Sequence, residues 1–96
     1  MIFGLFQRKR SDAELGEPIG EITHFFPHVK AGVIKITKGT VSSGDTVYIK
    51  GHTTAFEQKI KSMQINRQTV DNAQRGQEIG IKVAKRVRRG DKVYKV

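Results

Sequence analysis

The chain has 96 residues with 18 Lys and Arg against 9 Asp and Glu, which gives a formal net charge of +9. This length fits one domain and excludes two independent cores. The chain contains no Cys, which excludes a disulfide scaffold and a thiolate metal site. We expect a cytoplasmic protein without a membrane span, because no apolar run approaches the roughly 20 residues that a spanning helix needs.

The first eighteen residues differ in composition from the rest. Met1–Phe6 is apolar and is followed by the Arg8–Arg10 cluster, the reverse of the charge order in a signal peptide. We expect residues 1–18 to be a tail, either flexible or docked on a protein partner through Met1–Phe6. A lipid anchor is the less favoured reading, because six residues bury little area. Residues 19–96 are expected to form one folded domain.

Period-two alternation predicts strands in the first half of this domain. The segments Ile19–Phe26, Gly32–Thr37 and Thr46–Lys50 alternate between apolar and polar residues. In the first segment, Ile22, His24 and Phe26 are expected to share one face, with Phe26 in the core.

The second half continues with strand patterns. The apolar phase of Ala55–Arg67 switches near Ser62, which favours a strand with a β-bulge or bend over an amphipathic helix. Two further strands are predicted at Ile79–Val83 and Lys92–Val96. Short strands with frequent glycines predict an all-β fold, and a small closed antiparallel barrel of six or seven strands would hide their apolar faces.

Candidate catalytic and metal-binding groups are few. The Gly76–Gly80 stretch lacks the lysine of a phosphate-binding loop and leads into a strand, so we expect no nucleotide site. Of the histidines, His24 and His28 are separated by Pro27, which prevents a helical ligand pair. We expect no metal, no cofactor, no catalytic residues and hence no enzymatic activity of the chain itself.

Positive charge is concentrated near the C-terminus. Residues 82–96 contain seven cations and one acid, about two-thirds of the excess charge. This clustering favours a phosphate-facing patch over a merely solubilising surface. Aromatic residues interleaved with cations allow base stacking, for which Phe25, His24 and Tyr48 are candidates, whereas Phe26 and Phe56 are expected in the core.

Two spaced motifs carry a family resemblance. Gly39-Thr40-Val41 is followed by Gly44-Asp45 and an alternating strand, and a later Ala-x-x-Gly-x-x-Ile-Gly pattern contains Gly76 and Gly80. The glycines permit tight turns, Val41 fills the barrel, and the Asp45 carboxylate can cap its turn. This arrangement resembles the second, β-barrel domain of translational GTPases such as elongation factor Tu. It is most similar to small stand-alone translation elongation factor-like proteins, and it also looks like the barrel appended to some collagenase-like peptidases.

The resemblance implies a binding module without a GTPase domain. It implies binding of tRNA or ribosomal RNA, with His52 and Tyr48 near a base and the basic C-terminal patch on phosphates. The patch residues are Lys82, Lys85, Arg86, Arg88 and Arg89. The alternative is a protein-interaction module or accessory domain for a separately encoded enzyme, such as a collagenase-like peptidase.

Overall fold

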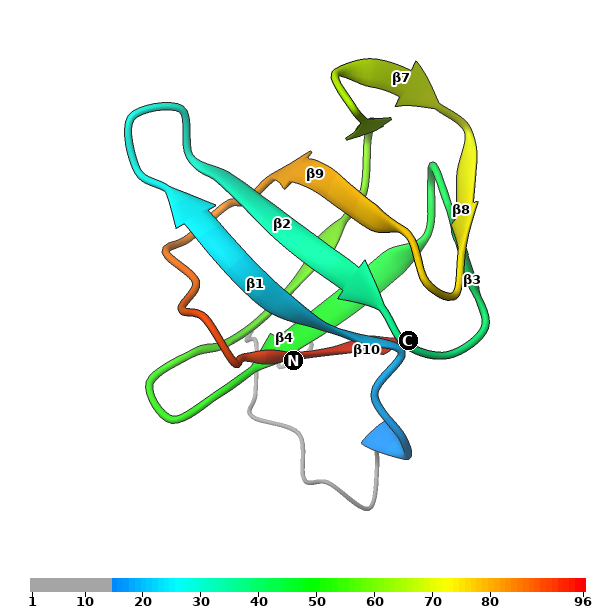
Figure 1. Ribbon diagram of the computed structural model, residues 1–96. Helices are drawn as coiled ribbons and strands as arrows, with labels where there is room; N and C mark the ends of the chain where they lie inside the picture. Colours follow the sequence, from blue (N-terminus) through cyan, green and yellow to red (C-terminus); the bar gives the residue numbers. More distant parts are fainter. Residues whose placement is uncertain (1–14) are drawn as a thin grey trace, which may run out of the picture.

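A computed structural model describes residues 15–96, which form ten β-strands (Figure 1). The predicted Met1–Phe6 docking segment lies outside the described residues. The strands are β1 (Gly20–Phe26), β2 (Ala31–Ile36), β3 (Thr40–Ser42), β4 (Thr46–Lys50), β5 (Ala55–Lys59), β6 (Met63–Ile65), β7 (Gln68–Val70), β8 (Asn72–Gln74), β9 (Glu78–Lys82) and β10 (Lys92–Lys95).

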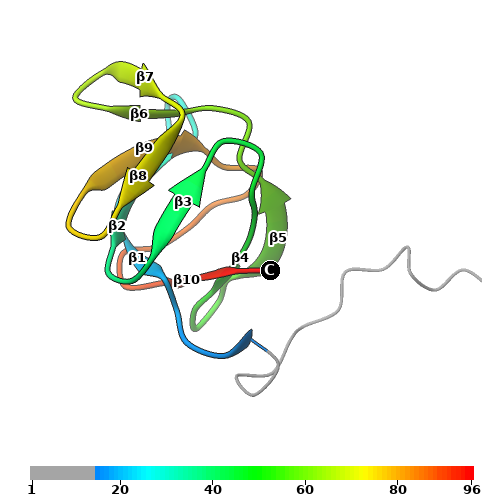
Figure 2. The same cartoon turned by 90° about the vertical axis from the view of Figure 1, so that its right-hand side faces the viewer.

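Eight strands form one antiparallel sheet in the order β5-β4-β10-β1-β2-β9-β6-β7, and β3 pairs with β8 in a small second sheet. The sheet curls strongly, and β3 and β8 lie together along its side (Figure 2). The all-β prediction is confirmed. The closed barrel of six or seven strands is wrong, because the edge strands β5 and β7 do not pair and the sheet is an open half-barrel.

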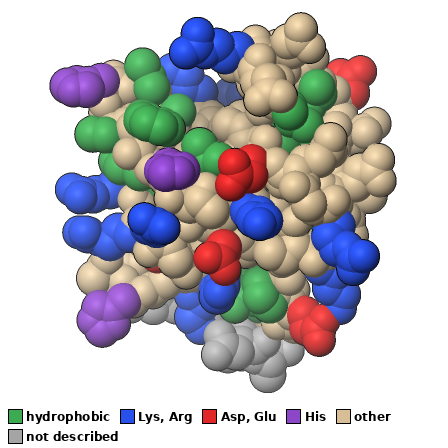
Figure 3. All heavy atoms as spheres, viewed as in Figure 1, with side chains coloured by type: hydrophobic (Ala, Val, Ile, Leu, Met, Phe, Trp, Pro, Cys, Tyr) green, Lys and Arg blue, Asp and Glu red, His purple; other side chains and the backbone are tan. Residues whose placement is uncertain are grey.

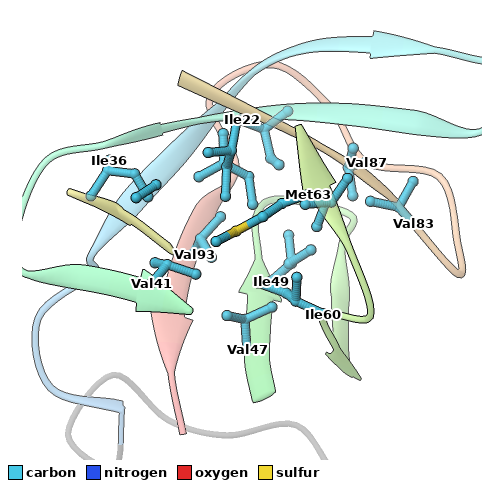
Figure 4. Packing of buried hydrophobic residues seen from close by; sticks show 14 of the residues in the cluster. Ile22, Ile36, Val41, Val47, Ile49, Ile60, Met63, Val83, Val87 and Val93 are labelled. Atoms are coloured by element: carbon cyan, nitrogen blue, oxygen red, sulfur yellow. The ribbon is translucent and has the colours of Figure 1, made fainter. Parts of the chain in front are cut away.

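The concave side of the half-barrel holds one apolar core. Strand alternation brings side chains from different strands into contact, with Met63 of β6 near the middle (Figure 4). Burying each such aliphatic side chain contributes about 1.5–3 kcal/mol relative to leaving it in water. The core residues without any exposed surface are Ile22, Ile36, Val47, Ile49, Met63, Ile79 and Val93.

A β-bulge in β1 changes which side chains face the core. Ile22 pairs with Ile34, but the next pair joins His24 to Val33, so one extra residue is inserted in β1. A one-residue insertion reverses the faces of all following residues. Phe26 is therefore 50% exposed, and the prediction that it lies in the core beside Ile22 was wrong. Phe25 packs against the core in its place.

The predicted phase switch near Ser62 takes the form of a break between two strands. β5 ends at Lys59 and β6 begins at Met63, and no helix forms between them. Ile60 in the break donates its N–H to the Asp45 carbonyl at 2.8 Å, and its own carbonyl accepts from the Gly44 N–H at 2.7 Å. These hydrogen bonds hold the break in place, so that Phe56 and Met63 are both buried although they belong to opposite phases of the period-two pattern.

The same turn occurs three times among residues 15–96. In Ser42–Asp45, Gln74–Gln77 and Arg88–Asp91, the third residue is a glycine with φ between +94° and +97°. The fourth residue donates its N–H to the first carbonyl at 3.0 Å, and its side-chain oxygen accepts from the first N–H at 2.8–2.9 Å. These are features of a type II turn, which requires positive φ at its third position. Gly44-Asp45 and Gly90-Asp91 therefore both end turns of this kind, and Gly76-Gln77 ends the third.

The remaining motif residues occupy neighbouring positions. Gly39 has φ +69° before β3, Thr40 begins β3, and Val41 is 1% exposed within the core. Gly80 lies inside β9 opposite Val33 and has open space above its Cα. These residues shape the sheet and its turns.

Two residues before β1 contact the domain through their side chains. Leu15 packs against Tyr48 and Tyr94 on the outer side of the sheet. Farther along, the exposed Glu17 pairs with Lys38, whose ammonium group holds the pKa of that carboxyl below its usual value. No helix among residues 15–96 is long and apolar enough to cross a membrane.

Candidate binding surface at the loop end

Three connections meet at one end of the half-barrel, on the left in Figure 1, and are here called the loop end. They are the β1–β2 turn (residues 27–30), the β4–β5 turn (51–54) and the long β9–β10 connection (83–91). Arg88 Nε donates to Thr53 Oγ1 at 2.9 Å, and Lys82 Nζ donates to the Val29 carbonyl at 3.0 Å. The first bond joins the β9–β10 connection to the β4–β5 turn, and the second joins the end of β9 to the β1–β2 turn.

Buried anchors fix the long β9–β10 connection. Val83 and Val87 are 4% and 1% exposed and lie against Gly32, where an added Cβ would approach each of them to 3.3 Å. Asp91 is 4% exposed, and its Oδ2 accepts from the Arg88 N–H at 2.9 Å. The cations between these anchors therefore lie on a segment whose position is fixed by buried side chains.

The structure brings most of the predicted basic patch together at the loop end. Lys85, Arg86 and Arg89 are exposed and form no ion pair or hydrogen bond with any described side chain. Arg88 and Lys82 are also exposed but are held by the contacts to Thr53 and Val29. Guanidinium and ammonium groups free of acidic partners can bind carboxylates or phosphates.

His52 and Tyr48, the two residues predicted to lie near a base, differ in exposure. His52 is exposed in the β4–β5 turn, beside Thr53. Tyr48 is 1% exposed and packs with Leu15 and Tyr94 on the outer side of β4. Tyr48 cannot stack on a ligand from this position, so its predicted contact role was wrong.

The apolar part of the surface was not predicted from the sequence. Phe26 and Val29 are 50% and 52% exposed near the tip of the β1–β2 hairpin. His24 stacks on Phe26 with a centroid separation of 6.1 Å and an interplanar angle of 21°. Figure 3 shows histidines, Lys and Arg, and apolar side chains together along this edge of the molecule. The signal available in the sequence was Phe-Phe-Pro immediately before a turn.

Gln58 bridges the edge strand β5 to the end of β9. Its Nε2 donates to the Lys82 carbonyl at 2.8 Å, and its Oε1 accepts from the Ala84 N–H at 2.8 Å. A carboxamide offers the same donor and acceptor as a peptide group. Gln58 therefore makes the contacts of a neighbouring strand where the half-barrel is open.

Replacing Gln58 with Glu tests this bridge. Gln58→Glu retains the acceptor but removes the donor and places a carboxylate against the Lys82 carbonyl. We expect a loss of about 1–2 kcal/mol in the free energy of unfolding, measured by urea denaturation. The matched Gln64→Glu exchange, at an exposed position of β6, is expected to change the free energy of unfolding by less than about 0.5 kcal/mol. Equal unfolding midpoints for the two variants would contradict the role of Gln58.

Across residues 15–96, no group of three or more His, Asp or Glu is placed to hold a metal ion. A hollow of about 360 Å³ lies between the end of β1 and the β9–β10 connection, lined in part by Thr23, Phe25, Pro27, Arg86 and Arg89. The loop end thus offers an open basic and apolar surface with a depression beside the end of β1.

Comparisons with known proteins point to peptidases. The chain is 39% identical over 77 residues to an uncharacterised protease of Methanocaldococcus jannaschii, covering 79% of this chain and 19% of that protein. It is 31% identical over 100 residues to a collagenase of Porphyromonas gingivalis, covering 84% of this chain and 28% of the collagenase. The chain therefore spans less than a third of these curated relatives. No protein-family model matches it.

The fold has a solved counterpart. The crystal structure of the C-terminal domain of a Geobacillus thermoleovorans protein assigned as a U32 peptidase superposes with a TM-score of 0.78 at 19% identity. The match covers 83% of this chain and 92% of that domain. A selenomethionine form of the same domain gives a TM-score of 0.76.

These matches correct the family prediction. The relatives are peptidase and collagenase proteins, and no translation factor is among them. The resemblance to domain II of elongation factor Tu, and to stand-alone elongation factor-like proteins, was therefore wrong as a family assignment, and the RNA-binding description that came with it loses its support. The physical reason for the error is that x-x-Gly-Asp forms a type II turn, which this chain uses at residues 42–45 and again at 88–91. The motif therefore indicates a turn and does not identify a family.

Proposed function

We propose that this chain is a non-catalytic accessory domain that acts together with a U32-type peptidase catalytic region. The alternative interpretation from the sequence, an accessory domain for a collagenase-like peptidase, agrees with the comparisons better than RNA binding does. The proposal concerns association with the enzyme.

The observation that carries the proposal is the unequal coverage of the alignments. About four-fifths of this chain aligns with the archaeal protease, yet that alignment accounts for 19% of the protease. The solved counterpart is itself a C-terminal domain, nearly all of which corresponds to this chain. The shared part is thus a discrete β-domain, and the greater part of each relative's length lies outside it.

Capture from the native cell tests the association. The full chain carrying an affinity tag is expressed at its natural level, and bound proteins are quantified by mass spectrometry after nuclease treatment. We expect a U32-type peptidase to be enriched over a tagged basic control protein of similar charge, since a charge of +9 alone attracts polyanions. Ribosomal proteins and RNA that are recovered only when nuclease is omitted, with no peptidase in either preparation, would contradict the proposal.

The absence of catalysis is tested separately. The purified chain is incubated with gelatin and with casein, and new amino termini are counted. We expect no release above the buffer control. Hydrolysis that co-purifies with the folded chain through two chromatographic steps would show that the chain is itself an enzyme.

A further inference from the structure

We propose that the loop end is the docking face, and that its occupant is an acidic protein segment carrying an exposed apolar side chain. The placement of that segment on a U32-type catalytic region rests on the proposed function. The chemistry of the segment follows from the surface itself.

The charge of the loop end is uncompensated. Residues 23–31, 51–54 and 82–90 contain no Asp or Glu, and the adjoining Asp91 is buried and bonded to the Arg88 N–H. Six cations project from these segments: Lys30, Lys82, Lys85, Arg86, Arg88 and Arg89. An unbalanced positive surface selects an anionic partner and accelerates its encounter with the protein.

The apolar component distinguishes an acidic protein segment from a nucleic acid. Phe26 and Val29 are two of the three large hydrophobic side chains that are exposed among the described residues. Val29 has no ring on which a base could stack, and His24 lies against Phe26. An apolar side chain of a protein can contact both, as in interfaces whose apolar centre is surrounded by a charged rim.

The depression lies between the cations and the exposed apolar side chains of the hairpin. Its walls include Phe25 and Pro27 on the hairpin side and Arg86 and Arg89 on the loop side. A segment crossing it could place carboxylates on the arginines while its apolar side chain contacts the hairpin. The buried Val83 and Val87 anchors hold the loop in place, which limits the entropy lost on binding.

Titration of purified components tests the chemistry. The probes are a fluorescent glutamate-rich peptide with a central Leu-Phe pair, a polyglutamate peptide of equal charge, and a single-stranded RNA of equal charge. Fluorescence anisotropy measures each affinity for the full chain. We expect the Leu-Phe peptide to bind most tightly.

Two variants test the charged part and the apolar part of the loop end separately. Lys85→Glu, Arg86→Glu and Arg89→Glu combined should weaken binding of the Leu-Phe peptide at least 10-fold. The control combines Lys35→Glu, Arg67→Glu and Arg75→Glu, which change the net charge equally and should weaken binding less than about 3-fold. All six cations are exposed. Circular dichroism verifies that each variant remains folded.

The apolar variant combines Phe26→Ser with Val29→Ser, and the control is Val96→Ser at another exposed site. The double variant should weaken the Leu-Phe peptide about 5- to 10-fold and leave polyglutamate binding unchanged. Tighter binding of RNA than of the peptide, unaffected by the apolar variant, would overturn the proposal. So would equal losses in the two charge variants.

The native-cell capture distinguishes this inference from the proposed function. If peptidase recovery is the same for wild type and the loop-end charge variant, the docking face is wrong while the accessory role stands. If the peptide results hold and no peptidase is recovered, the accessory role is wrong while the surface chemistry stands.

Discussion

Replacing Gly51 with Ala is expected to lower the free energy of unfolding by about 2–3 kcal/mol. An added Cβ would lie 2.5 Å from Cγ of Asp91 and closer still to Oδ1. Asp91 cannot withdraw freely, because it is 4% exposed and accepts a hydrogen bond from the Arg88 N–H. Urea denaturation monitored by circular dichroism measures the loss.

A matched glycine and a double-mutant cycle identify the cause. Gly80→Ala adds a Cβ with no heavy atom within 4 Å, and is expected to change stability by less than about 0.5 kcal/mol. In an Asp91→Ala background the cost of Gly51→Ala should fall by about 1–2 kcal/mol. Additive costs in the cycle, or equal costs for the two glycines, would show that Asp91 is not the obstacle.

Replacing Met63 with Ala is expected to cost about 3 kcal/mol. Met63 has no exposed surface and lies among core side chains from several strands (Figure 4), so the truncation leaves a cavity that β6 cannot easily close. The control is Val29→Ala, which truncates a side chain that is 52% exposed and should cost less than about 0.5 kcal/mol. Thermal and urea unfolding should both rank the variants in this order, and equal unfolding midpoints would contradict the assignment of Met63 to the core.

The fold was predictable where alternation extends over four or more residues. Strands β1, β2, β4, β9 and β10 follow from their period-two patterns. Of the four three-residue strands, β6 lies within the predicted Ala55–Arg67 strand, whereas β3, β7 and β8 are too short to show a period. Closure of the barrel could not be predicted either, because it depends on whether the edge strands β5 and β7 pair. That pairing joins residues far apart in the chain, and no local sequence pattern encodes it.

The candidate site was predictable in its charge and unpredictable in its apolar part. The cations of residues 82–89 lie within one short stretch of the chain, so their clustering is visible in the sequence. The exposure of Phe26 depends on a single inserted residue in β1, and the burial of Tyr48 on contacts with Leu15 and Tyr94, distant in sequence. The Gly-Asp motif correctly predicted a turn, but its use as evidence for the elongation factor family was wrong.

The central claim, association with a U32-type catalytic region, is tested most directly by sedimentation velocity with the purified chain and the peptidase recovered from the native cell. We predict a one-to-one complex that persists after nuclease treatment and is weakened by charge reversal at Lys85, Arg86 and Arg89. Separate sedimentation of the two proteins at concentrations where both are folded would contradict the claim.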